Sequence, residues 1–408
     1  MKKTEFFETA VQQGFYGQEK SGLYGKKDNV RKYWEDISIK NSLRAKILNL
    51  INKKQKIKIA DLGSGCGEGF ELITHIPPAN KTSTQKDFIL NKNDIDLYLG
   101  LDISPSMVEM GNEIYKDHKN VVFKTADLSK DWTFLDYAQF DLYLSTYSSP
   151  SHLSVHELTL LVSRILEHSE KNTLLVLDLF GKYSPEWPQY WSKQKEELLT
   201  YNMSWLYLPQ KPGADIIENY YVTFWGADDL KKIIEGIALQ KKKTVKIEFI
   251  DRSIFVGRHI DTGIYNNHPQ PIRYQVNRLF DRDYRGEPDK LKIDFSFLRD
   301  FETLNPDVYK RILMYGEDWN NTVKFLEALW KEDNNLIKEM IETSKEELSE
   351  EFKMLAWLER NASRFPVVDF WASIMGPQIA CILRNLEINL PDGVGCGHGL
   401  VCLVEINS

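Results

Sequence analysis

The chain has 408 residues, of which 42% are hydrophobic, and its formal net charge is -7 at pH 7. A chain of this length can bury one large core or two moderate ones. The acidic balance excludes the broad positive field with which a dedicated nucleic-acid binder gathers phosphates. No apolar run approaches membrane-spanning length, and Glu5 and Glu8 interrupt the uncharged stretch that a signal peptide needs.

The four cysteines show no paired CxxC spacing; they are Cys66, Cys381, Cys396 and Cys402. Neither a zinc ribbon nor a disulfide framework is therefore indicated. We expect a cytoplasmic protein that interacts with neither a membrane nor nucleic acid.

The first half of the chain alternates between strand-like and helix-like segments. Apolar positions at helical spacing toward Leu50 and Ile51 predict an N-terminal helical segment. Short apolar runs of strand length follow at 57–62, 97–102, 121–124, 140–145 and 174–179. Predicted helices lie between them at 69–75, 106–116 and 155–168. This order predicts a doubly wound α/β fold, with a parallel sheet covered by helices on both faces.

After residue 179 the pattern changes. Residues 183–225 are rich in Trp and Tyr, and a helix is predicted at 227–239. Residues 243–260 are interpreted as two extended runs joined at 251–253, a hairpin that would close the sheet. Amphipathic stretches at 307–331 and 344–361 predict helices, and Ser344 and Glu347 have capping-box spacing. The run 399–406 is a predicted strand with no assigned partner.

The stretch "ADLGSGCGEG" predicts a ligand-binding loop between a strand and a helix. The strand ends at Asp61, and the chain then turns through Gly63, Gly65 and Gly67, which leave backbone amides exposed with no Cβ in the way. A GxGxxG dinucleotide fingerprint needs a small residue where Glu68 stands, and no GK[ST] of a phosphate loop follows. The loop resembles instead the first motif, DxGxGxG, of the class I S-adenosylmethionine-dependent methyltransferases.

The resemblance extends over residues 56–260. "YLGLDISPSMVEMGNEIY" is similar to the second motif, whose acidic residue binds the ribose hydroxyls, and "VVFKTADLSKDW" is similar to the third, whose Asp accepts from the adenine amino group. "FDLYLSTYSSPSHLS" resembles the fourth strand and the loop that reaches toward substrate. The implied cofactor-binding residues are Asp61, Gly63, Ser64, Gly65, Gly67, Asp102, Ile103, Met107, Asp127, Leu128 and Ser145.

One departure from the family pattern concerns the ribose carboxylate. A polar insertion at 77–93 lengthens the path from the glycine loop, which leaves Asp94 and Asp96 as alternatives to Asp102. Placement at a strand end favours Asp102.

The resemblance implies a seven-stranded, Rossmann-like methyltransferase sheet with additions at both ends. We expect an N-terminal helical segment at 1–55, the cofactor domain at 56–262 with an aromatic-rich insertion at 183–225, and a mostly helical region at 263–408. The last region would cover the cleft or mediate self-association as a homodimer. The family often folds its N-terminal segment over the cofactor, which makes Tyr24, Arg31 and Tyr33 candidate contacts. Arg31 can bind a carboxylate bidentately, or it is an exposed salt-bridged arginine.

The acceptor side of the site carries open alternatives. His152 is a candidate catalytic base and substrate contact, or its ring caps the following helix. His152 and His156 have the spacing of a metal pair, but a solvated helix face explains it better and no metal is expected. The aromatic residues of 183–225 form either a lid around a flat or cationic acceptor or an ordinarily packed insertion. Further candidate substrate contacts are Tyr147, Trp187, Tyr190, Trp225 and Arg258.

The glycine-rich run at 393–400 is interpreted as a turn into the last strand, because no helix follows it.

Methyl transfer to nitrogen or oxygen of a small molecule is the leading activity that the resemblance implies. S-adenosylmethionine would donate the methyl group in line and leave as S-adenosylhomocysteine. The acidic charge and the absence of a [DN]PP[YF] signature from "STYSSPSHL" disfavour DNA or RNA acceptors. Two alternatives stay open: a lyase, cyclase or aminocarboxypropyl transferase that uses the same sulfonium, and a non-catalytic scaffold subunit with the same fold.

Overall fold

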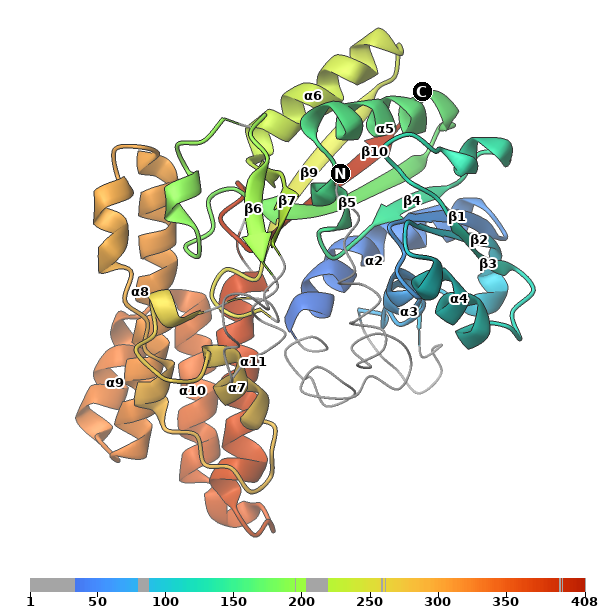
Figure 1. Ribbon diagram of the computed structural model, residues 1–408. Helices are drawn as coiled ribbons and strands as arrows, with labels where there is room; N and C mark the ends of the chain where they lie inside the picture. The colour runs from blue at the N-terminus through green and yellow to red at the C-terminus, as the bar shows by residue number, and fades with distance from the viewer. Residues whose placement is uncertain are drawn as a thin grey trace.

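The computed structural model describes residues 34–79, 88–194, 196–202, 219–257, 260, 262–388, 390 and 392–407. Its centre is a sheet with the strand order β3-β2-β1-β4-β5-β10-β9 (Figure 1). The strands are β1 (Ile57–Leu62), β2 (Ile95–Asp102), β3 (Val121–Thr125), β4 (Leu142–Ser145), β5 (Thr173–Gly181), β9 (Val245–Arg252) and β10 (Gly399–Ile406). A short strand, β8 (Phe224–Trp225), adds to β5. The five strands β1 to β5 pair in parallel, and β10 is antiparallel to both of its neighbours.

Helices cover both faces of this sheet, so the predicted doubly wound α/β fold is confirmed. Figure 1 shows α5 (Val155–His168) and α6 (Ala227–Gln240) on one face. On the other face lie α2 (Asp36–Lys53), α3 (Glu68–Thr74) and α4 (Pro105–Ile114). The all-buried pattern of β5 fits a strand that is covered from both sides.

The sequence of α5 explains both its start and its orientation. Ser154 Oγ accepts from Glu157 N at 3.3 Å, and the Glu157 carboxylate accepts from Ser154 N at 2.7 Å, which completes a capping box. Leu158, Leu161 and Ile165 recur at helical spacing and are buried against the sheet.

A helical unit lies beside the sheet unit and has its own core (Figure 1). It comprises α7 (Ile272–Arg278), α8 (Pro306–Trp330), α9 (Asn334–Thr343), α10 (Glu346–Arg360) and α11 (Gly376–Ile388). Phe325 and Phe352 stack at 3.9 Å between ring centroids where α8 meets α10. The predicted capping box of Ser344 does not form, because Ser344 ends α9 and the N-cap of α10 is Lys345.

The predicted hairpin at 243–260 is wrong in its second strand. Ser253 has φ +59°, which ends β9, and Ile254, Phe255 and Val256 are then buried in the core of the helical unit. The neighbour of β9 is instead β10, in which Gly399 lies opposite both Phe180 and Arg252. The sequence analysis placed residues 399–406 within the mostly helical region 263–408, whereas in the structure they form a strand of the central sheet.

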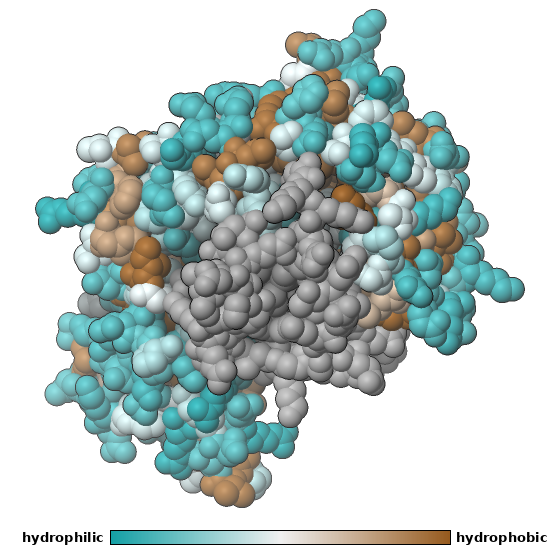
Figure 2. Space-filling view, viewed as in Figure 1, coloured by the Kyte–Doolittle hydropathy of each residue, from teal (hydrophilic) through white to brown (hydrophobic). Residues whose placement is uncertain are grey.

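A two-stranded hairpin stands beside the end of β5. It is formed by β6 (Leu199–Asn202) and β7 (Asn219–Val222), which pair antiparallel. On the face shown in Figure 2, hydrophilic residues predominate and hydrophobic ones gather in small groups. No helix in the described ranges has the length and apolar character needed to cross a bilayer.

Candidate functional site

The glycine loop between β1 and α3 has the backbone geometry that only glycine adopts easily. Gly63, Gly65 and Gly67 have φ values of +78°, +53° and +104°. The N–H groups of Gly63 and Ser64 both donate to the Leu101 carbonyl, at 2.8 and 3.0 Å. The loop is thus fastened to the end of the neighbouring strand β2.

Asp102 links this loop to the carboxyl end of β2. Its Oδ2 accepts from Gly65 N at 2.8 Å and its Oδ1 accepts from Ser104 N at 2.9 Å. Burial raises the pKa of Asp102, while these backbone hydrogen bonds lower it. Beside it, Ile103 is 49% exposed, although it is a large apolar residue. A carboxylate next to an open apolar side chain can receive a ribose and its base.

The two alternatives to Asp102 lie at the opposite end of β2. The Asp94 carboxylate accepts from Asn91 N at 2.9 Å in a short capping box. Asp96 is exposed and lies 3.9 Å from the ammonium of Lys58. The glycine loop follows the carboxyl end of β1, so only Asp102 stands next to it.

Asp61 lies beneath the loop and is fully buried. The Tyr98 hydroxyl donates to its Oδ2, and a Cβ placed on Gly69 would come within 2.2 Å of the same atom. Burial raises the pKa of Asp61 to about 7. The Asp61 carboxylate therefore lies against the start of α3, and its expected role as a direct cofactor contact stays a prediction.

The other expected cofactor contacts occupy mixed positions. Asp127 follows β3, and its Oδ1 accepts from the N–H and hydroxyl of Ser129. Burial raises the pKa of Asp127, but these hydrogen bonds and Lys130 outweigh it and lower the pKa overall. Leu128 packs against the core under α5, Met107 is buried, and the Ser145 hydroxyl donates to the Leu62 carbonyl.

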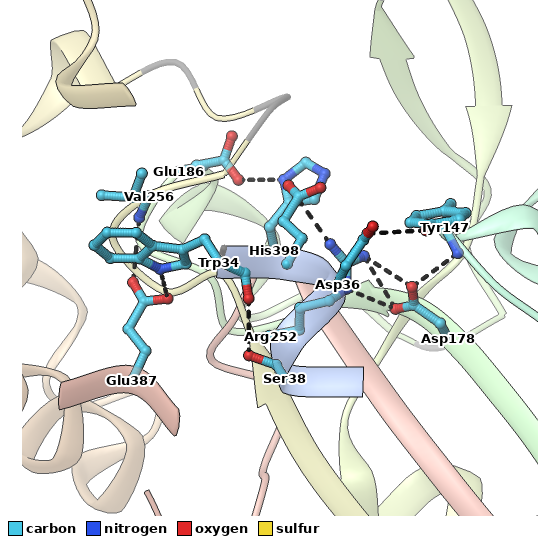
Figure 3. Close-up of polar contacts among 11 residues, drawn as sticks. Trp34, Asp36, Ser38, Tyr147, Asp178, Glu186, Arg252, Val256, Glu387 and His398 are labelled. Atoms are coloured by element: carbon cyan, nitrogen blue, oxygen red, sulfur yellow. Dashed lines mark hydrogen bonds and ion pairs between the residues drawn. The ribbon is translucent and has the colours of Figure 1, made fainter. Parts of the chain in front are cut away.

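The loop after β4 holds two consecutive residues in the left-handed region. Tyr147 and Ser148 have φ values of +56° and +62°, which costs energy for residues with a side chain. Tyr147 N donates to Asp178 Oδ2 at 2.8 Å, and its hydroxyl donates to Asp36 Oδ1 at 2.9 Å (Figure 3). Such strain is concentrated at binding and catalytic sites.

The same loop joins the glycine loop to an aromatic cluster. Ser149 Oγ donates to the Gly63 carbonyl at 3.1 Å, and Ser151 Oγ accepts from Phe180 N at 2.8 Å. Two residues of chain span at most about 7 Å. The end of β5 therefore lies next to the glycine loop.

The aromatic cluster is the set of rings around the end of β5: Phe180, Trp187, Tyr190, Tyr201, Tyr220 and Phe224. Trp187 and Tyr190, two expected substrate contacts, lie 4.8 and 5.2 Å from Phe224 between ring centroids. The His152 ring stacks on Tyr220 at 5.0 Å, and burial lowers the pKa of His152 to about 4. His152 is therefore neutral near neutral pH. Trp225, also expected to face substrate, instead lies in the core under α5 and α6.

A buried ion pair crosses the same edge of the sheet. Arg252 Nη2 lies 2.9 Å from Asp178 Oδ2, and Arg252 Nη1 lies 3.7 Å from Glu35 Oε1, just before α2 (Figure 3). Burial raises the pKa of Asp178, whereas Arg252 lowers it. Because Asp178 also accepts from Tyr147, this pair fixes the loop after β4 relative to α2.

The sequence interpretation missed one pair at this edge, His398 and Glu186, which lie 2.7 Å apart. His398 stands in the glycine-rich run that was interpreted as a plain turn. The overlooked signal is a histidine flanked by Gly397 and Gly399. At both glycines a Cβ would clash with Arg252, so glycines on both sides of a histidine indicate that the loop is tightly packed around it.

Four expected contacts, Tyr24, Arg31, Tyr33 and Arg258, lie outside the described residues. Among the residues that are described, no group of three His, Cys, Asp or Glu side chains could hold a metal ion.

A search of protein-family models finds no match, and neither does a search of curated proteins. Among solved structures, the chain is similar to an S-adenosylmethionine-dependent methyltransferase from Clostridium acetobutylicum, with 11% identity, a TM-score of 0.37, and coverage of 61% of this chain and 91% of that one. It is similar to SAM-bound CalS10, an amino pentose methyltransferase from Micromonospora echinaspora (11% identity, TM-score 0.33, coverage 61% and 92%). A TehB-like SAM-dependent methyltransferase from Corynebacterium glutamicum also matches (15% identity, TM-score 0.29, coverage 52% and 84%). The fold itself is assigned from the strand order and the glycine loop.

The residues at the carboxyl edge fit S-adenosylmethionine. The left-handed glycines give the loop the turn that brings its backbone to this edge, Asp102 offers a ribose acceptor, and Ile103 offers an apolar surface for adenine. The strained loop after β4 leads from this position to the aromatic cluster, where an acceptor could bind.

Proposed function

We propose that the protein is an S-adenosylmethionine-dependent methyltransferase that acts on nitrogen or oxygen of a small molecule. The observation that carries the proposal is the hydrogen bond between Gly65 N and Asp102 Oδ2. It joins the glycine loop to a carboxylate at the end of the neighbouring strand, beside the exposed Ile103. This arrangement suits a nucleoside with a free ribose better than a pyrophosphate, since it sets a carboxylate where a phosphate would be repelled.

One group of residues would bind the nucleoside, and a second group would bind the acceptor. Asp102, Ile103 and the glycine loop would bind and orient the nucleoside, and Asp127 with Leu128 would contact adenine. When bound, the cofactor supplies an electrophilic methyl group on its sulfonium. The chain would align the acceptor with that methyl group and exclude water, which is most of what an in-line displacement requires. Tyr147, Trp187 and Tyr190 are the proposed acceptor contacts. His152 stacks on Tyr220 and is too weak a base to be the main proton acceptor near neutral pH, so we assign it to acceptor binding.

Calorimetry with the purified full chain tests the proposal. S-adenosylmethionine and S-adenosylhomocysteine should each bind with measurable heat at one site. Absence of heat from both would refute the proposed function.

Product analysis separates methyl transfer from the other sulfonium reactions. S-adenosylhomocysteine, formed together with a methylated small molecule from a metabolite extract, is the expected outcome. Methylthioadenosine in its place would assign the protein to aminocarboxypropyl chemistry instead.

A further inference from the structure

The glycine-rich loop before β10 is built to hold His398 at the carboxyl edge of the sheet. The Asp251 carboxylate accepts from Val394 N at 2.9 Å and from Gly395 N at 2.7 Å. His398 N donates to the Ser253 carbonyl at 2.8 Å, and Gly181 N donates to the His398 carbonyl at 3.1 Å. Both sides of the His398 backbone are thus fixed, and the residue lies between the ends of β5 and β9.

His398 and Glu186 form a buried imidazole–carboxylate pair. His398 Nδ1 lies 2.7 Å from Glu186 Oε2, and their side chains are only 2% and 8% exposed (Figure 3). A carboxylate only accepts hydrogen bonds, so the proton between the two atoms lies on Nδ1 when the ring is neutral. The basic lone pair is then on Nε2, and the carboxylate stabilises the imidazolium that forms when Nε2 takes up a proton.

Aromatic rings surround this pair on several sides. The His398 ring centroid lies 5.3 Å from those of Phe180 and Trp187 and 6.4 Å from that of Tyr201. The arrangements are edge-to-face or tilted, which are favourable geometries for aromatic pairs. Trp187 is itself held in place, because its Nε1 donates to the Gly181 carbonyl at 2.8 Å.

The pair also stands next to the glycine loop. Ser151 binds Phe180 N, and Ser149, two residues earlier, binds Gly63. Gly399, the residue after His398, lies directly opposite Phe180 in the sheet. The pair and its rings therefore lie at the same edge of the sheet as the nucleoside that the glycine loop is proposed to bind.

Among the described residues, two charged side chains near this pair are engaged with other groups. Arg252 packs against Gly399 but is paired with Asp178, and Asp251 is engaged by the loop's own N–H groups. The His152 ring stacks on Tyr220, and burial lowers the pKa of His152 to about 4. A neutral amine attacks without prior loss of a proton, whereas a hydroxyl must lose one during transfer. An imidazole–carboxylate pair is therefore of most use to an oxygen acceptor.

We propose that the methyl acceptor is a planar aromatic molecule with a hydroxyl group, that His398 Nε2 takes the hydroxyl proton, and that Glu186 positions and stabilises His398. This inference rests on the proposed function. In the step, the O–CH₃ bond forms while the S–CH₃ bond breaks, and the electron pair of the broken bond stays on sulfur as S-adenosylhomocysteine. The hydroxyl proton moves to Nε2, and the imidazolium later returns it to water.

The probe is 4-nitrophenol, whose phenolate absorbs at a longer wavelength than the neutral phenol. The full chain is first saturated with S-adenosylhomocysteine, whose binding is measured separately by calorimetry. We expect bound 4-nitrophenol to absorb as phenolate at a pH below its own pKa. His398→Asn should abolish that band while the probe still quenches tryptophan fluorescence. Glu186→Gln, which is nearly isosteric, should move the ionisation midpoint of the bound probe back toward its value in water.

His156→Asn and Glu197→Gln are the matched controls, because both residues are exposed and lie outside the pair. Both controls should keep the phenolate band. An unchanged band in His398→Asn would overturn the inference, as would the absence of any band in the wild-type protein that still binds S-adenosylhomocysteine. Loss of nucleoside binding in the wild-type protein would instead refute the proposed function. Circular dichroism shows whether His398→Asn has folded. If it has not, the test is the ionisation midpoint of bound 4-nitrophenol in Glu186→Gln, and an unchanged midpoint would overturn the inference.

Discussion

At the scale of single residues, the Asp102 carboxylate combines an observed structural contact with a proposed ligand contact. It holds the glycine loop through Gly65 N, and it offers acceptor capacity to a ligand on the same edge. A carboxylate oxygen accepts more than one hydrogen bond, so ribose hydroxyls can add to the existing contacts. If the loop binds the nucleoside as proposed, its shape and its affinity are coupled through this side chain.

Asp102→Ala should weaken S-adenosylhomocysteine binding by roughly 1 to 3 kcal/mol, because the ribose hydroxyls would lose their acceptor. Titration calorimetry measures the change. Asp96→Ala, at the exposed opposite end of β2, is the control and should leave the affinity as it is. Equal affinities of wild type and Asp102→Ala would show that another residue binds the ribose.

Individual residues were predictable where local chemistry decides their position. The end of a strand was enough to prefer Asp102 over Asp94 and Asp96. The burial of Asp61 and Trp225 was not predicted, because it depends on partners far away in the sequence, here Tyr98 on β2 and the helices over β5. His398 was missed because its partner Glu186 lies 212 positions away.

At the scale of elements, the glycine loop depends on close packing as much as on flexibility. A Cβ on Gly67 would lie 2.5 Å from Tyr115 and 2.9 Å from Phe123, at a φ of +104°. Both rings belong to the core that α3 and α4 share with the sheet. The loop that approaches the ligand is thus shaped from behind by aromatic side chains.

Gly67→Ala should lower the free energy of unfolding by about 1 to 3 kcal/mol, since the new side chain meets both strain and contact. Gly236→Ala is the matched control: it lies in α6, where a Cβ would meet nothing within 4 Å. That change should raise stability by about 0.5 to 1 kcal/mol. Denaturant unfolding compares the two, and equal effects would contradict this account of the loop.

Most elements could be read from the sequence because their signals are local. The apolar run Ile57–Leu62 and the capped helix Val155–His168 have the predicted bounds. The second half of the predicted hairpin failed, since Ile254 to Val256 are apolar enough for a strand but pack into the helical core. Apolar character alone does not say which core a segment joins.

At the scale of the whole molecule, Glu387 on α11 connects the helical unit to the start of α2. Trp34 Nε1 donates to Oε2 at 2.5 Å, and Val256 N donates to Oε1 at 3.2 Å (Figure 3). Phe255 N donates to the same Oε1 at 2.7 Å. Burial raises the pKa of Glu387 to about 7, although these hydrogen bonds lower it. Trp34 precedes Glu35, which pairs with Arg252, so the two units meet through neighbouring residues.

Stability should fall as pH rises through this pKa. The folded protein keeps the Glu387 proton up to about pH 7, whereas the unfolded chain releases it near 4.5. Between those values folding takes up a proton, so the free energy of unfolding decreases with increasing pH. In Glu387→Gln the side chain does not titrate, so this contribution to the pH dependence is removed. The wild-type protein should therefore lose more stability than the variant between about pH 5 and about pH 8. The free energy of unfolding of both proteins is measured with denaturant at each pH, and the same pH dependence in both would contradict the raised pKa of Glu387. The raised pKa of Asp61 does not affect this comparison, because Asp61 is present in both proteins.

One consequence of the strand order concerns how the molecule is made. After β5 and β9 the chain builds the helices α7 to α11, and only then does it form β10, which lies between β5 and β9. During synthesis, the edges of β5 and β9 that pair with β10 therefore stay unpaired after β9 has been made, until more than a hundred further residues have left the ribosome. The unpaired edges could pair with other chains, so we expect chaperones to bind the nascent chain there. The sheet is completed only after the helices α7 to α11 have been synthesised.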